Sequence, residues 1–141
     1  RGAATGREPL LWILHIGYGW LAAGFILLAL NGMTQAVPET AALHAFTVGA
    51  IATMMLAVMT RASLGHTGRP LTAGIRTVSI YALVTVAALL RLAAPLAGAQ
   101  MELVMSVAGL SWSAAFALFA LFYGPLLCAP RPAADAAVAP I

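Results

Sequence analysis

Four long apolar runs occupy most of the chain, and short polar segments separate them. The runs extend over residues 9–30, 41–60, 77–94 and 103–127. A helix needs roughly 20 apolar residues to cross a hydrocarbon core about 30 Å thick, because each residue rises about 1.5 Å. The pattern therefore predicts an all-α, polytopic transmembrane bundle of four antiparallel spanning helices within residues 1–128. Residues 129–141, rich in Ala and Pro, are predicted to form a disordered tail.

The composition agrees with a membrane location. Hydrophobic residues make up 62% of the chain and charged residues 8%, whereas about one quarter of the residues in soluble domains are charged. The lipid bilayer is therefore the expected partner. The seven basic residues are all Arg and form no run, so no nucleic-acid partner is predicted. Cys128 is the single cysteine, which excludes an internal disulfide or a C-x-x-C site.

The distribution of Arg predicts the orientation. Six of the seven Arg residues lie in the N-terminal tail, the connector between the second and third runs, and the C-terminal tail. Arg91 lies on the other side, together with Glu39 and Glu102. By the positive-inside rule, both ends and the 61–76 connector are expected to be cytoplasmic.

This connector is expected to be irregular, because it contains Gly65, Gly68, Pro70 and Gly74. It also contains His66, which is expected to lie among the basic residues Arg61, Arg69 and Arg76. Glycines allow a sharp loop with exposed backbone amides, and such a loop with positive charge suits an anion. A haem propionate and a lipid headgroup are both possible ligands.

Two histidines are predicted to lie within the membrane, where ionisable residues are functional candidates. His15 shares a helical face with Tyr18 and with Leu11, Gly19, Ala22 and Ile26, on which a flat cofactor has room. The alternative for His15 is a hydrogen bond to Ser or Thr of a neighbouring helix. His44 is expected near the opposite membrane face, either as a ligand oriented by Thr47 or as a satisfied polar group. An axial separation of about 15 Å prevents His15 and His44 from sharing one ion.

Other patterns favour packing over chemistry. Met54, Met55 and Met59 are soft enough for Cu(I), but core packing is the preferred interpretation. Small residues predict helix-packing seams at Gly19, Ala23, Ser106, Gly109, Ser113 and Ala117. Tyr123 fits an interfacial aromatic belt. The apolar runs contain no Asp or Glu, which argues against a carboxylate proton pathway.

The stretch LHAFTVGAIATMMLAVMTRASLGHTGRPL, from Leu43 to Leu71, resembles the NnrS family of bacterial membrane proteins. In that family an H-A-x-T-x-G-A-I helix runs into M-x-R-x-S/T-L-G-H-T-G-R. The opening L-x-x-L-H-x-G-Y-x-W, from Leu11 to Trp20, also agrees. Family members are longer, so the chain looks like their C-terminal part, and N-terminal helices of the same protein are expected partners.

The resemblance implies a multi-pass protein of the bacterial inner membrane that contains haem and copper. It further implies a role in the response to nitric oxide and nitrosative stress in denitrifiers and pathogens. His15, His44 and His66 then become candidate metal ligands. Arg61 and Arg69 become candidate propionate or anion partners. Tyr18, which shares the helical face of His15, is a further candidate cofactor-binding residue. Whether the protein is an enzyme stays open.

Two other functions are compatible with the residues. One is a transport or scaffold protein whose histidines are structural and whose cytoplasmic loop binds lipid or a partner. The other is a quinol-linked oxidoreductase, for which the sequence identifies no electron donor.

Overall fold

The computed structural model describes residues 8–35 and 37–130, and these residues form helices joined by short turns. Three of the arginines used to predict the orientation, at positions 1, 7 and 131, lie outside the described residues. The same holds for the predicted tail from residue 131 onward. The elements are α1 (Pro9–Thr34), α2 (Glu39–His44), the π-helix η2 (Ala45–Ile51), α3 (Ala52–His66), α4 (Ile75–Ala93), the 3₁₀ turns η3 (Ala94–Leu96) and η4 (Gly98–Gln100), and α5 (Met101–Cys128). Four of the described helical segments are long and apolar enough to span a membrane, which confirms the predicted fold class.

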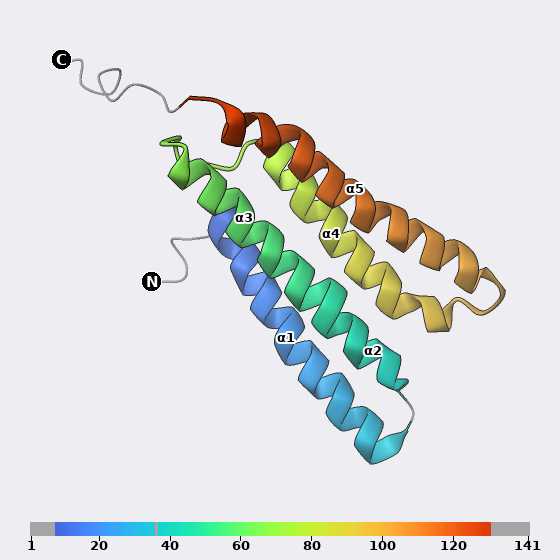
Figure 1. Ribbon diagram of the computed structural model, residues 1–141. Helices are drawn as coiled ribbons and strands as arrows, with labels where there is room; N and C mark the ends of the chain where they lie inside the picture. The colour runs from blue at the N-terminus through green and yellow to red at the C-terminus, as the bar shows by residue number, and fades with distance from the viewer. Residues whose placement is uncertain (1–7, 36, 131–141) are drawn as a thin grey trace.

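The helices form two antiparallel hairpins that lie side by side (Figure 1). One hairpin pairs α1 with the continuous helix made of α2, η2 and α3, and the other pairs α4 with α5. α1 and α5 lie at opposite edges, and α3 and α4 lie between them. The outer surfaces of the edge helices are therefore largely apolar and uncovered, as expected where lipid or further helices make contact.

The shared core lies between the hairpins and combines branched aliphatic side chains with two tyrosines. Its buried members are Leu10, Ile13, Ala52, Leu56, Ala57, Leu64, Ile80, Tyr81, Val84, Ala115 and Tyr123. The Tyr81 hydroxyl is 2.5 Å from the Thr60 hydroxyl, and the Tyr123 hydroxyl is 2.6 Å from that of Thr77. Each pair satisfies two polar groups that burial would otherwise penalise. Tyr123 is thus a core residue, and its assignment to an interfacial belt was wrong.

The connector between α3 and α4 is shorter than the sequence predicts. α3 continues through Arg61 to His66, and α4 already begins at Ile75. α3 ends in a Schellman motif, in which Arg69 N–H donates to Leu64 O (2.9 Å) and Gly68 N–H donates to Gly65 O (3.2 Å). Gly68 has a φ of 68°, which glycine adopts without the steric cost of a Cβ atom. The irregular part of the chain is therefore residues 67–74.

A π-helical segment interrupts the second spanning helix. η2 begins directly after His44, and Ala52 N–H bonds to Thr47 O, five residues earlier. π-Helical turns are rare and occur frequently at functional sites. A π-helical turn holds more residues than an α-helical turn. The side chains of α2 therefore point in a different direction around the helix axis, relative to those of α3, than in an uninterrupted α-helix.

The glycines at close helix approaches are not those predicted from spacing. A Cβ atom added to Gly19 or Gly109 would meet nothing within 4 Å, so neither lies in a packing seam of the described chain. Close packing instead occurs at Gly17 against Met54, at Gly24 against Phe46, and at Gly49 against Trp20. These contacts hold α1 against η2 and α3.

Gly49→Ala is expected to destabilise the protein by on the order of 1–3 kcal/mol. The new Cβ would lie 2.8 Å from Trp20 Cγ, close to the backbone of α1, where the ring has little freedom to move. Gly19→Ala is the matched control, because its Cβ atom enters open space. It should not lower the free energy of unfolding, since Ala favours a helix more than Gly. The measurement is SDS-induced unfolding in mixed micelles, followed by circular dichroism. Equal unfolding midpoints for the two variants would contradict the packing described.

Candidate functional site

The three histidines occupy three different places. His15 is exposed on α1, His44 is half-buried at the end of α2, and His66 is exposed at the end of α3. Within residues 8–35 and 37–130, no three His, Cys, Asp or Glu side chains gather in an arrangement able to hold a metal ion. Any metal bound by one of these histidines would therefore need further ligands from elsewhere.

His15 is held by a hydrogen bond to the backbone of its own helix. Its Nδ1 lies 3.0 Å from Leu11 O, and because a carbonyl only accepts, Nδ1 must carry the proton of this bond. Nε2 is then left with its lone pair, which is how backbone carbonyls fix the tautomer of ligating histidines. The bond lies within α1 and does not join His15 to a Ser or Thr of another described helix.

The surface around His15 is open. Tyr18, one turn along, is 63% exposed, and Gly19 beside it leaves free space. Ala22 and Ile26 continue the same uncovered face. The face that the sequence predicts for a flat cofactor is thus accessible in the described chain.

His44 is held by a partner that the sequence did not indicate. Arg91 Nε on α4 donates to His44 Nε2 at 3.1 Å. His44 is therefore neutral in this arrangement, with its proton on Nδ1, and Nε2 is not available to a metal. Thr47 does not orient His44, because its hydroxyl donates instead to Leu43 O at 2.8 Å.

The basic residues near the 67–74 connector have different surroundings. Arg61 is half-buried and lines a groove of about 360 Å³ with Leu14, Val58, Ala62, Gly65 and Leu71. Arg69 Nε is buried and has no hydrogen-bond partner among the described residues. Arg76 lies over the Phe122 ring, 5.1 Å from its centroid. Arg61 and Arg69 thus remain suited to an anionic group, whereas Arg76 has an aromatic partner.

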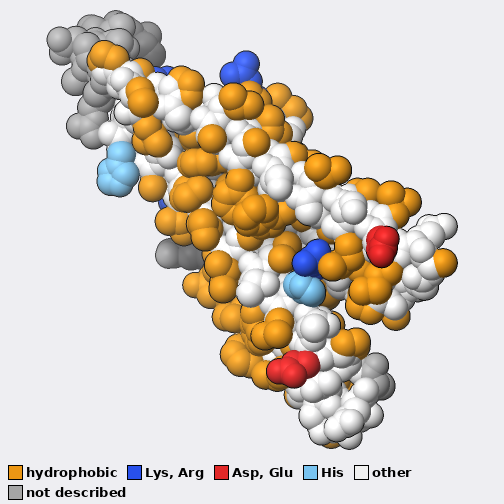
Figure 2. Space-filling view, turned by 45° about the vertical axis from the view of Figure 1, so that its right-hand side comes forward, with side chains coloured by type: hydrophobic (Ala, Val, Ile, Leu, Met, Phe, Trp, Pro, Cys, Tyr) orange, Lys and Arg blue, Asp and Glu red, His pale blue; other side chains and the backbone are white. Residues whose placement is uncertain are grey.

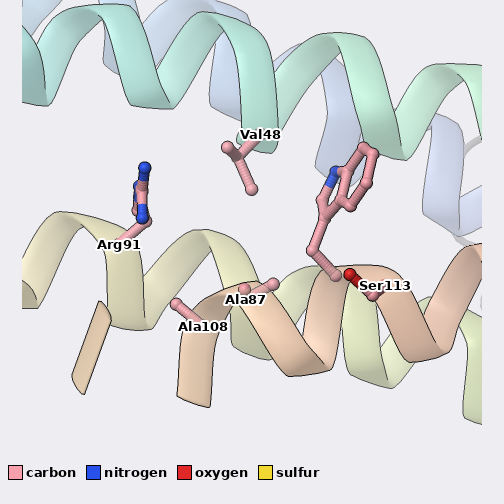
Figure 3. Close-up of a pocket in the computed structure, with 7 residues that line it drawn as sticks. Val48, Ala87, Arg91, Ala108 and Ser113 are labelled. Carbon is pink, nitrogen blue, oxygen red and sulfur yellow. The ribbon is translucent and has the colours of Figure 1, made fainter. Parts of the chain in front are cut away.

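A second hollow lies between the hairpins, beside the His44–Arg91 pair. Figure 2 shows a histidine and a basic side chain in contact in this hollow, with acidic side chains elsewhere on the same face. The close-up in Figure 3 shows Arg91 projecting from α4 toward the facing helix, which also directs Val48 into the gap. The cavity measures about 230 Å³, and its lining residues are Val48, Ala87, Arg91, Ala108, Gly109, Trp112 and Ser113.

This cavity is the part of the site that sequence reasoning missed. Arg91 entered the sequence interpretation only through the positive-inside count, although it lies inside the third apolar run. An arginine within a spanning segment needs a polar partner or a polar cavity. The position of Arg91 in the third apolar run could therefore have indicated this site.

Comparison with known families decides the affiliation. A family model described as NnrS protein matches residues 1–131, which is nearly the whole chain. The chain belongs to the NnrS family. The comparisons with curated proteins and with solved structures gave no match.

The NnrS motif residues have visible structural roles in this chain. The segment H-A-F-T-V-G-A-I is His44 followed by the entire π-helix η2. The segment L-G-H-T-G-R forms the Schellman end of α3, in which Gly68 takes the left-handed conformation. Part of the motif therefore specifies backbone geometry, and only His15, His44 and His66 within the NnrS segments offer imidazole ligands.

Proposed function

We propose that this chain belongs to a haem- and copper-binding protein of the bacterial inner membrane that acts in the response to nitric oxide and nitrosative stress. Membership of the NnrS family supports the cofactors and the role. In the proposed topology both ends of the chain are cytoplasmic, because six of the seven arginines then lie on that side.

The observation that carries the proposal is the geometry of His15. The Leu11 carbonyl takes the Nδ1 proton, and Nε2 remains as a ligand on an exposed face. In the proposal His15 Nε2 would hold the haem iron and Tyr18 and Gly19 would border the ring, while Arg61 and Arg69 are the candidate partners of the propionates. Haem bound there would supply an iron atom able to coordinate nitric oxide. The remaining contacts come from polypeptide outside this chain.

Copper is assigned on family grounds alone. The described residues offer no cluster of ligands for it, and His44 Nε2 is engaged by Arg91. We therefore assign copper to no set of residues in this chain. His66 stays a single candidate ligand, and His44 would bind a metal only after giving up its bond to Arg91.

One observation favours the alternative function at His44. Its bond to Arg91 joins the two hairpins, as structural polar contacts between helices do, and it occupies the nitrogen that a metal would need. A transport or scaffold protein with structural histidines would use His44 in this way. The two functions make opposite predictions about cofactor content.

The protein produced from the complete gene and purified in detergent is expected to show a Soret band and to contain copper by elemental analysis. Nitric oxide added under anaerobic conditions should shift the Soret band, because haem iron with an open position binds it. Protein that contains neither haem nor copper would overturn the proposal and favour the transport or scaffold alternative.

A further inference from the structure

Arg91 is a cation in a spanning helix without a compensating carboxylate. It is half-buried on α4, and its recorded hydrogen bond goes to His44, which accepts it as a neutral imidazole. Glu39 and Glu102 are exposed, and no ion pair joins either of them to Arg91 within the described residues. The bond to His44 uses Nε, so it leaves the two terminal amino groups of the guanidinium for another ligand.

The cavity next to Arg91 offers hydrogen-bond donors within apolar walls. Arg91 and the Trp112 indole can only donate, and the Ser113 hydroxyl can donate as well. Neither Trp112 nor Ser113 hydrogen-bonds to another described residue. Val48, Ala87 and Ala108 supply the apolar part of the lining, which contains no carboxylate. Arg91 is half-buried, whereas Trp112 is 41% exposed and Ser113 is exposed. The attraction of a negative charge is therefore strongest at the guanidinium, where burial lowers the dielectric.

The size of the cavity limits the ligand. At about 230 Å³ it is smaller than the roughly 300–1,000 Å³ of pockets for drug-sized ligands, so a macrocycle does not fit. One guanidinium neutralises one negative charge, and a divalent anion would leave excess charge within a spanning segment.

We propose that this cavity binds a small inorganic monoanion, such as chloride, at the terminal amino groups of Arg91, with the Trp112 indole and the Ser113 hydroxyl as further donors along the same cavity. His44 is a positioning residue, because its bond holds Nε and leaves the terminal amino groups of the guanidinium for the cavity that Arg91 lines. The anion neutralises the arginine and fills the hollow between η2 and the α4–α5 hairpin. This site is independent of the haem proposal, which rests on His15 at another face of the molecule.

The test is a titration of the purified protein with sodium chloride at constant ionic strength, followed by tryptophan emission. Sodium gluconate and sodium sulfate replace chloride in parallel titrations, as a larger monoanion and a dianion. We expect a saturable change with chloride alone, and its loss in Trp112→Phe. A change that gluconate or sulfate produces equally would overturn the proposal, because it would report ionic strength instead of a site.

Two kinds of variant locate the response. Arg91→Gln should raise the apparent Kd for chloride on the order of tenfold or more, since it removes charge-assisted hydrogen bonds. Gly109→Leu should block binding with Arg91 intact, because its side chain enters open space at the cavity wall. Gly124→Leu is the matched control on α5, also in open space but outside this cavity, and should bind as the wild type does. Unchanged binding in Gly109→Leu would overturn the site even if Arg91→Gln failed to fold.

Discussion

Replacing His15 with alanine is expected to abolish haem binding. Changes to residues that merely orient a ligand typically cost 10–100-fold in metal affinity, so we expect the loss of the ligand to cost roughly 100-fold or more. His15 is the histidine whose Nδ1 proton is bound by its own helix and whose Nε2 faces an uncovered surface. The measurement is the Soret absorbance per protein in membranes from cells expressing the complete gene.

Three comparisons make this result specific. Tyr18→Phe and His66→Ala should retain the Soret band, because neither removes the proposed iron ligand. Imidazole added to the His15→Ala protein should restore part of the absorbance, since the alanine leaves room for a free ligand at the same face. Full haem content in His15→Ala would exclude His15 as the iron ligand. The haem would then be bound by other residues.

Replacing His44 with leucine is expected to destabilise the protein by about 1–3 kcal/mol. The change removes the acceptor of Arg91 Nε and leaves a charged donor without its partner in a spanning segment. Arg91→Leu in the same protein should recover most of this loss, because replacing both partners by apolar groups can be nearly neutral. The measurement is a double-variant cycle of unfolding free energies in mixed micelles.

Thr47→Ala is the control for this cycle, since Thr47 is exposed and bonds only within its own helix turn. It should change the unfolding free energy by a few tenths of a kcal/mol. Strictly additive costs of His44→Leu and Arg91→Leu would show that the two side chains do not interact in the folded protein.

The spanning helices were predictable because their signal is local. In lipid every backbone group must be satisfied within the helix, so a long apolar run has few alternatives to an α-helix. The helix ends were less predictable. The C-terminal end of α3 depends on Gly68 and on two backbone bonds that only form once the chain turns.

Contacts between helices could not be read from spacing. Lipid tails and neighbouring helices are both apolar, so the sequence does not distinguish a glycine facing lipid, such as Gly19, from one facing a ring, such as Gly49. The π-helix adds a further difficulty, because counting 100° per residue fails across residues 45–51. His15, Tyr18 and Ile26 are exposed together on α1, as the count of 100° per residue predicts, because α1 has no such interruption. The His44–Arg91 pair was not predicted, since it joins residues 47 positions apart.

The length of the second spanning helix has a consequence for its surroundings. From Glu39 to His66 it holds 28 residues and is therefore about 42 Å long, whereas the hydrocarbon layer is about 30 Å thick. The helix must either lean within the bilayer or extend into the headgroup layer. In the upright case, with the extra length shared equally by both ends, Arg61 lies about 7.5 Å from the end of α3 and thus close to the boundary of the hydrocarbon layer. The tilt of this helix is therefore expected to depend on the thickness of the membrane that contains the protein.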